Sequence, residues 1–113
     1  MALHLFAGIA VRDFAAAVAW YERLFGAPPA FFPADTEAVW ELAAQRWVYI
    51  EARPARAGHA MLTLLVEDLD DRLTAMAARG LEPALRETYE NGVRKITFRD
   101  PDGNEIGLGD APD

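Results

Sequence analysis

The apolar residues follow a helical spacing in two segments of the chain. The two apolar stripes run at intervals of three and four residues and consist of Phe14, Val18, Tyr21 and Phe25, and of Leu69, Leu73 and Met76. Asp13 and Asp68 precede the stripes as N-caps, because a carboxylate there accepts the free amide hydrogens of the first helical turn. Gly26 and Gly80 follow as C-terminal stops. The pattern predicts two helices, each with one face turned to a core.

Runs with the composition of β-strands surround both helices. The expected strands lie at 4–11, 28–32, 38–42 and 46–52 in the first half, and at 59–66, 82–87, 92–98 and 104–109 in the second. Asn91-Gly92 and Asp102-Gly103 predict tight turns, because Asn-Gly and Asp-Gly pairs accept the positive φ that such turns need. Each half is therefore expected to contain a strand, a helix and then three strands.

The two halves also repeat one another in sequence. At one constant offset, the residues His4, Val11 and Asp13 recur as His59, Val66 and Asp68. A chain of 113 residues suits one domain. We therefore expect a single α+β domain, 1–113, of two βαβββ modules in tandem, with module one at 1–55, module two at 56–113 and a linker around 53–58.

Alternation along the expected strands separates a helix-facing side from an outer side. Leu5, Ala7, Ile9 and Val11 are uniformly apolar and are expected to pack on the helices. The outer side mixes aromatic, histidine and carboxylate side chains, and a concave surface of that kind suits a small ligand. The predicted ligand contacts are Phe6, Trp47, Tyr49, Glu51, Met61, Thr63 and Glu105. Alternatively, a partner chain covers this face, and open sheet edges favour a homodimer in either case.

Composition narrows the classes of partner. The net charge is −7, from 18 acidic and 11 basic residues, and Lys95 is the only lysine. Nucleic-acid binding needs clustered cations that displace counterions from phosphates, so no nucleic-acid partner is expected. An acidic surface attracts cationic ligands, although it also serves solubility alone.

Two features that the sequence lacks bear on the cellular location of the protein. No run approaches the ~20 apolar residues of a membrane span, and the N-terminal residues lack a basic run before a long apolar one. The chain also has no cysteine, which excludes disulfides and thiolate catalysis. We therefore expect a cytoplasmic protein with no membrane partner.

Two segments of the chain carry a resemblance to a known family. RDPDGNEIGL at 99–108 and VRDFAAAVAWYERLFG at 11–26, together with the repeat, resemble the vicinal oxygen chelate superfamily of glyoxalases, bleomycin resistance proteins and extradiol dioxygenases. The resemblance implies the glyoxalase/bleomycin-resistance fold, in which two βαβββ modules form a cup-shaped sheet. It covers essentially the whole chain, but the chemistry of the fold varies widely.

The same resemblance indicates that the usual metal ligands are missing. The positions that hold a ligand in metal-dependent relatives correspond here to Phe6, Met61 and Gly107. Phe and Gly offer no side-chain lone pair, and a thioether is a poor ligand for hard divalent ions. This pattern resembles the bleomycin-resistance branch, which implies sequestration of a small molecule with no cofactor and no catalytic residue. The acidic composition and the aromatic side chains of the outer side suggest that the molecule is cationic or aromatic.

The sequence also leaves open an alternative in which the protein binds a metal ion. His4, Glu51, His59 and Glu105 are all expected on the outer side, and such a set suits zinc, nickel, manganese or iron. His4, His59 and Glu105 each lie two residues, roughly 6.6 Å along the strand, before a usual ligand position. Glu51 lies on the equivalent strand of the first half. Under the two-fold that the resemblance implies, the two pairs separate by about 13 Å, which disfavours one shared ion. The alternative functions are thus a metal-dependent glyoxalase- or dioxygenase-like lyase or oxidoreductase, and a dimeric module without a ligand.

Overall fold

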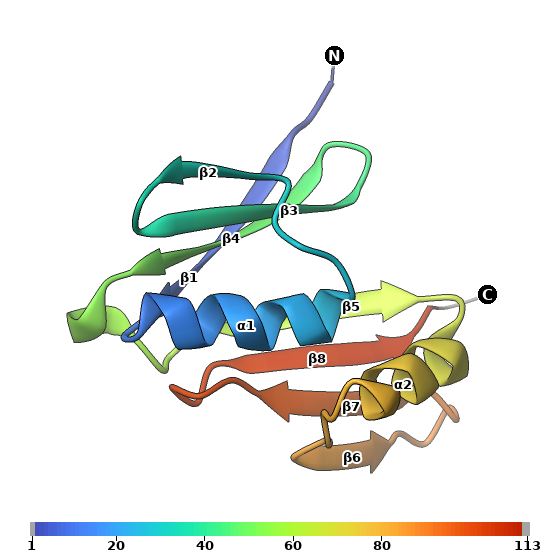
Figure 1. Ribbon diagram of the computed structural model, residues 1–113. Coiled ribbons are helices and arrows are strands. Elements are labelled where there is room, and N and C mark those ends of the chain that lie inside the picture. Colours follow the sequence, from blue (N-terminus) through green and yellow to red (C-terminus); the bar gives the residue numbers. More distant parts are fainter. Residues whose placement is uncertain (1, 112–113) are drawn as a thin grey trace.

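The computed structural model describes residues 2–111, which form two consecutive βαβββ modules (Figure 1). Module one contains β1 (Leu5–Val11), α1 (Phe14–Phe25), β2 (Phe31–Ala34), β3 (Glu37–Ala43) and β4 (Arg46–Ala52). A short 3₁₀ turn, Pro54–Arg56, leads to module two, which contains β5 (Met61–Val66), α2 (Leu69–Ala78), β6 (Leu85–Thr88), β7 (Arg94–Arg99) and β8 (Glu105–Asp110). The α+β fold and the duplicated order of elements confirm the prediction from sequence. Neither helix is long or apolar enough to cross a membrane within these residues.

Each module makes its own four-stranded sheet with the same topology. The first sheet has the order β1-β4-β3-β2 and the second sheet the order β5-β8-β7-β6. In each sheet the first strand pairs in parallel with the last, and the remaining pairs are antiparallel. β1 and β5 therefore each lie at a sheet edge and pair on one side only within the described chain.

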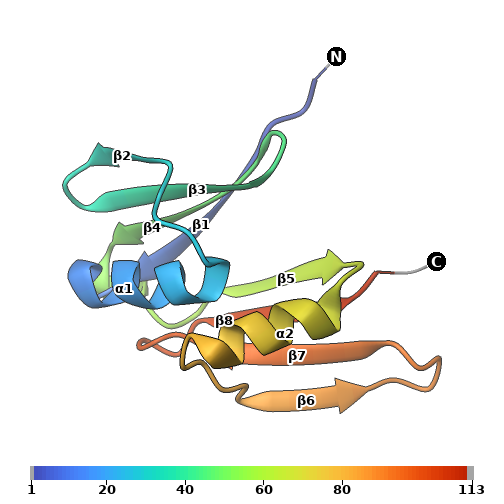
Figure 2. The same ribbon diagram turned by 45° about the vertical axis from the view of Figure 1, so that its right-hand side comes forward.

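The helix-facing sides of both sheets share one apolar core. Figures 1 and 2 place α1 between the two sheets and α2 against the second sheet. The core cluster draws on both sheets and both helices, with Ile9, Ile50, Trp20, Leu24, Leu69, Phe98, Ile106 and Leu108 among its members. The alternation predicted from sequence is confirmed for Ile9 and Val11, which are buried. Leu5 is 57% exposed, because it lines an open groove beyond the end of α1.

Three of the four predicted helix boundaries follow the expected chemistry. Asp13 caps α1, since its Oδ1 accepts a hydrogen bond from the Ala16 amide at 3.1 Å. Gly26 ends α1 with φ 74°, and Gly80, with φ 85°, follows the end of α2. The prediction of a side-chain cap at Asp68 is wrong, because its carboxylate accepts from the Arg72 guanidinium at 2.6 Å instead. That hydrogen bond also lowers the pKa of Asp68.

The DPDGN turn between β7 and β8 is the main polar connection between the modules. Asn104 is fully buried, and its side-chain amide donates to Ala10 O of β1 at 2.9 Å and to Asp100 Oδ2 at 2.8 Å. Its Oδ1 accepts from the amides of Gly58 and Ala60 in the linker, at 3.1 and 2.9 Å. One side chain therefore satisfies backbone groups from the first strand, the linker and the last turn.

Asp100 extends this network into α1. Its Oδ2 accepts a hydrogen bond from the Tyr21 hydroxyl at 2.8 Å, and its Oδ1 accepts from the amides of Asp102 and Asn104. Burial, followed by the Asp100 carboxylate, raises the pKa of Tyr21 far above its usual value.

A second polar contact connects the end of α2 with α1, because Arg79 donates to the carbonyls of Arg23 and Leu24 at the C-terminal end of α1. A cation is favourable there because it complements the unpaired carbonyls.

The Asn104 network predicts a large loss of stability on truncation. Asn104→Ala removes the partners of the Gly58 and Ala60 amides and of the Ala10 carbonyl, and each buried group left unpaired costs about 1–3 kcal/mol. We expect the free energy of unfolding, measured in urea, to fall by about 3 kcal/mol or more. Asn91→Ala, in the exposed β6–β7 turn, is the matched control and is expected to have a much smaller effect. Equal losses in the two variants would contradict this account of the turn.

The Tyr21–Asp100 hydrogen bond predicts a specific alkaline response. Because the folded state raises the pKa of Tyr21, its contribution to stability is complete below the unfolded pKa of about 10 and declines above it. Tyr21→Phe is expected to lose about 1.5–3 kcal/mol at neutral pH, as for a hydrogen bond to a charged group. The difference between wild type and variant is then expected to shrink by up to about 1.4 kcal/mol per pH unit above 10. A difference that stays constant to about pH 11 in urea titrations would contradict this assignment.

Candidate functional site

The outer face of the first sheet, opposite the helices, carries a cluster of aromatic side chains. Phe6 on β1 lies beside Trp47 on β4 in the register, and their rings stack at 5.4 Å with an interplanar angle of 4°. Phe31 on β2 meets Trp47 edge-on at 6.0 Å. With Tyr49, these residues form what we call the aromatic platform: Phe6, Phe31, Trp47 and Tyr49. Phe6 and Phe31 remain 49% and 45% exposed, so the platform is open to a ligand.

The platform depends on a glycine in the neighbouring strand. Gly8 on β1 pairs with Tyr49, and a Cβ built at Gly8 would lie 2.5 Å from the Tyr49 Cζ atom. The tyrosine ring therefore lies flat against the backbone of β1, a position that a larger residue at 8 would deny it. This close approach explains why the strand has a glycine in the middle of an otherwise continuous run.

Trp47 has an unusual polar atom. Its indole Nε1 is buried, and it is the one buried side-chain nitrogen or oxygen within residues 2–111 that has no hydrogen-bond partner. Leaving such a donor unpaired costs about 1–3 kcal/mol. Because this atom is covered by protein, a ligand meets Trp47 through the indole ring that stacks on Phe6, which makes Trp47 a candidate binding residue.

The carboxylates expected to meet a ligand already have cationic partners. Glu51 forms an ion pair with Arg53 at 3.0 Å, and Glu105 one with Arg99 at 3.1 Å. His4 and His59 precede β1 and β5, on different sheets. No three His, Asp or Glu side chains within residues 2–111 are grouped as metal ligands would be. The chain itself therefore does not gather the set of His4, Glu51, His59 and Glu105.

The outer face of the second sheet holds the remaining predicted contacts. Met61 lies opposite Glu105 in the register, and Thr63 lies opposite Gly107. Met61 is 82% exposed. Because the two sheets turn their helix-facing sides to a shared core, their outer faces point away from each other. The residues predicted as one site thus form two separate faces within one chain: Phe6, Trp47, Tyr49 and Glu51 on the first, and Met61, Thr63 and Glu105 on the second.

The sequence did not reveal two parts of the candidate surface. Phe31 was not singled out, because β2 is a short strand with an irregular register and gives no alternation to assign its face.

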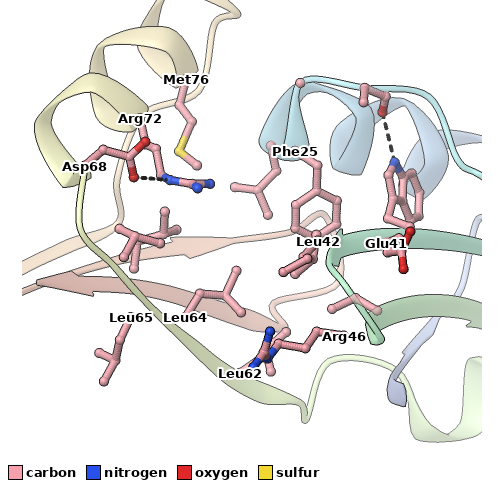
Figure 3. A pocket seen from close by; sticks show the side chains of 18 of the residues that line it. Phe25, Glu41, Leu42, Arg46, Leu62, Leu64, Leu65, Asp68, Arg72 and Met76 are labelled. Carbon is pink, nitrogen blue, oxygen red and sulfur yellow. Dashed lines mark hydrogen bonds and ion pairs between the residues drawn. The ribbon is translucent and has the colours of Figure 1, made fainter. Parts of the chain in front are cut away.

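The second part is an open groove of about 1170 Å³ on the helix-facing side, between the modules (Figure 3). Leu42, Leu62 and Leu64 line it together with Phe25 and Met76, and the Asp68–Arg72 ion pair lies at its edge. The sequence signal for this groove was the run of apolar residues on β5, because α2 covers only part of that run.

Comparison with a protein-family model identifies a relationship over nearly the whole chain. Residues 2–108 match the model described as the Glyoxalase/Bleomycin resistance protein/Dioxygenase superfamily. A solved structure described as a glyoxalase / bleomycin resistance protein from Catenulispora acidiphila DSM 44928 is 58% identical, with a TM-score of 0.95. The match covers 98% of this chain and 100% of that one. Among curated proteins, none matches the chain.

More distant solved structures share the fold. One is a bleomycin-binding protein complexed with bleomycin, with 21% identity, a TM-score of 0.78 and coverage of 98% of this chain and 100% of that one. Another is a lactoylglutathione lyase from Agrobacterium tumefaciens, with 16% identity, a TM-score of 0.77 and coverage of 97% and 93%. At these identities the likeness concerns the fold, which one binding protein and one lyase have in common.

Proposed function

Because the chain belongs to the glyoxalase/bleomycin resistance protein/dioxygenase superfamily, we propose that it binds a small planar molecule against the aromatic platform without a metal ion. The platform is the observation that carries this proposal. Stacked, half-exposed rings on a sheet face are costly to leave in water, and such exposed apolar patches mark binding sites. The protein acts by stoichiometric sequestration, in the cytoplasm, as the sequence led us to expect.

Three residues support binding rather than metal-dependent catalysis. Phe6 stacks on Trp47, Met61 is exposed as a thioether, and Gly107 has no side chain. None of these residue types supplies a hard oxygen or nitrogen ligand. Glu105, which lies opposite Met61 in the register, is held by an arginine, and so is Glu51 on the first sheet. The residues present therefore favour a ligand site that needs no ion.

We further propose that the complete site is shared between two copies of the chain. The two outer faces point apart, so a cup lined by both requires the first sheet of one copy to face the second sheet of another. The edge strands β1 and β5 each pair on one side only within the described residues, and they offer hydrogen-bonding groups to a partner. A bleomycin-binding relative complexed with its ligand makes a small-molecule cup a reasonable use of this fold.

Removal of a ring from the platform is expected to weaken binding. With naphthalenemethanol as a neutral planar probe, Trp47→Ala and Tyr49→Ala are each expected to raise the dissociation constant at least tenfold, because a buried aromatic contact contributes about 1.5–3 kcal/mol. Isothermal titration calorimetry measures this directly. Tyr89→Ala, which removes a half-exposed ring outside the platform, is the matched control and is expected to bind normally.

The same titration in the presence of a chelator tests the absence of a metal. Affinity is expected to stay unchanged after dialysis against the chelator, since no step of the proposal needs an ion. Loss of binding on chelation, or unaltered binding by both platform variants, would overturn the proposed function.

Mixed dimers test whether the cup is shared. Trp47→Ala damages the first face, and Thr63→Arg places a bulky charge on the second. If the cup spans two chains, a mixed dimer of the two variants has one intact cup and one doubly damaged cup. Co-expressed and purified through two different tags, it is expected to bind about half as much probe as wild type, whereas each variant alone binds little. Failure of the mixture to regain binding would contradict a shared cup.

A further inference from the structure

The outer face of the second sheet carries a cationic group above β8, where Gly107 and Gly109 have no side chains. We propose that Lys95, together with the hydroxyls of Thr63 and Thr97, binds a carboxylate or another oxyanion group of the ligand. This inference rests on the proposed function, and it makes the ligand class a planar aromatic acid. It departs from the cationic ligand that the acidic composition suggested.

The geometry around Gly107 brings the three residues together. Gly107 on β8 lies between Thr63 on β5 and Thr97 on β7 in the register. A Cβ built at Gly107 would lie 2.9 Å from the Lys95 Cε atom and 3.2 Å from the Thr63 Oγ1 atom. The lysine chain therefore crosses β8 toward Thr63 instead of extending away from the sheet. Any larger residue at 107 would displace it, so the glycine that removes a metal ligand also makes room for an ammonium group.

The charges on this face leave Lys95 without a partner. Arg99 is paired with Glu105, whereas Arg94 lies on the helix-facing side of β7, where Asp70 of α2 and Asp110 hold it. Glu87 lies opposite Lys95 in the register, but no ion pair joins them. Within residues 2–111, Lys95 has no hydrogen bond or ion pair to a side chain. Its ammonium group therefore has three donors available for a ligand.

The two threonines complete a set of donors of the kind an oxyanion needs. Thr97 is only 5% exposed, so its hydroxyl lies at the floor of the face, while Thr63 is exposed at its side. Neither hydroxyl takes part in a side-chain hydrogen bond with another described residue. A carboxylate has two oxygens and accepts several hydrogen bonds, and those from a charged donor are about twice as strong as neutral ones.

Two acidic residues of the ligand faces are already paired with arginines, whereas Glu37 and Glu41 on the first face and Glu87 on the second form no ion pair within residues 2–111. Glu51 and Glu105 each hold an arginine already, and a cationic ligand must displace that arginine before it gains an ion pair. An anionic group that binds next to Lys95 does not have to displace a partner from an existing ion pair. The donors at Lys95 therefore favour an acid, although Glu87 lies opposite Lys95 in the register and the net charge of the whole chain is −7.

Three probes with one aromatic body separate charge from stacking: naphthoate, naphthalenemethanol and naphthylmethylammonium. We expect wild type to bind naphthoate most tightly. Lys95→Met keeps the length of the side chain and is expected to weaken naphthoate binding at least tenfold while leaving naphthalenemethanol within twofold. Arg86→Met removes one positive charge from the helix-facing side of the same sheet and is the matched control. Thr63→Val is expected to weaken naphthoate binding by a few-fold.

The outcomes distinguish this inference from the proposed function. If all three probes bind equally and Lys95→Met changes none of them, or if the ammonium probe binds best, the anion site is wrong and the aromatic cup stands. If no probe binds, the aromatic cup itself is wrong, and the inference fails with it. Should Lys95→Met unfold the protein, Lys95→Gln provides the neutral variant, and the salt dependence of naphthoate binding provides a readout in wild type. A naphthoate affinity that does not fall with rising salt would overturn the proposal.

Discussion

The structure depends on the burial of one asparagine at the junction of two similar halves. A buried polar group must be hydrogen-bonded, and Asn104 meets this requirement by joining Ala10, the linker and Asp100. Through Asp100 the constraint reaches Tyr21 of α1. Because these bonds have fixed directions, they set how module two lies against module one. The direction in which each ligand face points follows from that orientation.

The sequence predicted features that depend on local pattern. Ile9 and Val11 face the core and Trp47 and Tyr49 face outward, as alternation alone requires. The prediction failed where neighbouring groups compete, as at Asp68, whose carboxylate prefers Arg72 to the helix amides. It also could not supply Phe31, which lies in a short irregular strand, or the groove between the modules. Both depend on contacts between segments that no local pattern encodes, and for the same reason the sequence left open whether the cup is built within one chain or across two.

The net charge of the chain and the local charges around the proposed ligand site differ in sign. The acidic balance of the chain is a property of the whole surface, whereas a ligand meets only a few groups at short range. The pairs Glu51–Arg53 and Glu105–Arg99 neutralise two of the carboxylates that alternation places outward, while Glu37, Glu41 and Glu87 form no ion pair within residues 2–111. Among the described residues, the unpaired charges on the outer face of the second sheet are Glu87 and Lys95, and the lysine side chain occupies the space that Gly107 of the adjacent strand leaves open. Since the fold is shared by a binding protein and a lyase, such local details decide what each member does.

The hydrogen bonds of the Asn104 network join residues far apart in the sequence, which affects how the chain folds during its synthesis. Ala10 and Asn104 are 94 residues apart, and Tyr21 and Asp100 are 79 apart. Module one therefore cannot pair its buried polar groups while it emerges alone from the ribosome, although it comprises a complete sheet and helix. Contacts of such high order form late and slow the folding of a domain. Until residues 100–104 arrive, the apolar surface of α1 is open to aggregation, so the N-terminal half has a need for chaperones that its simple topology does not suggest.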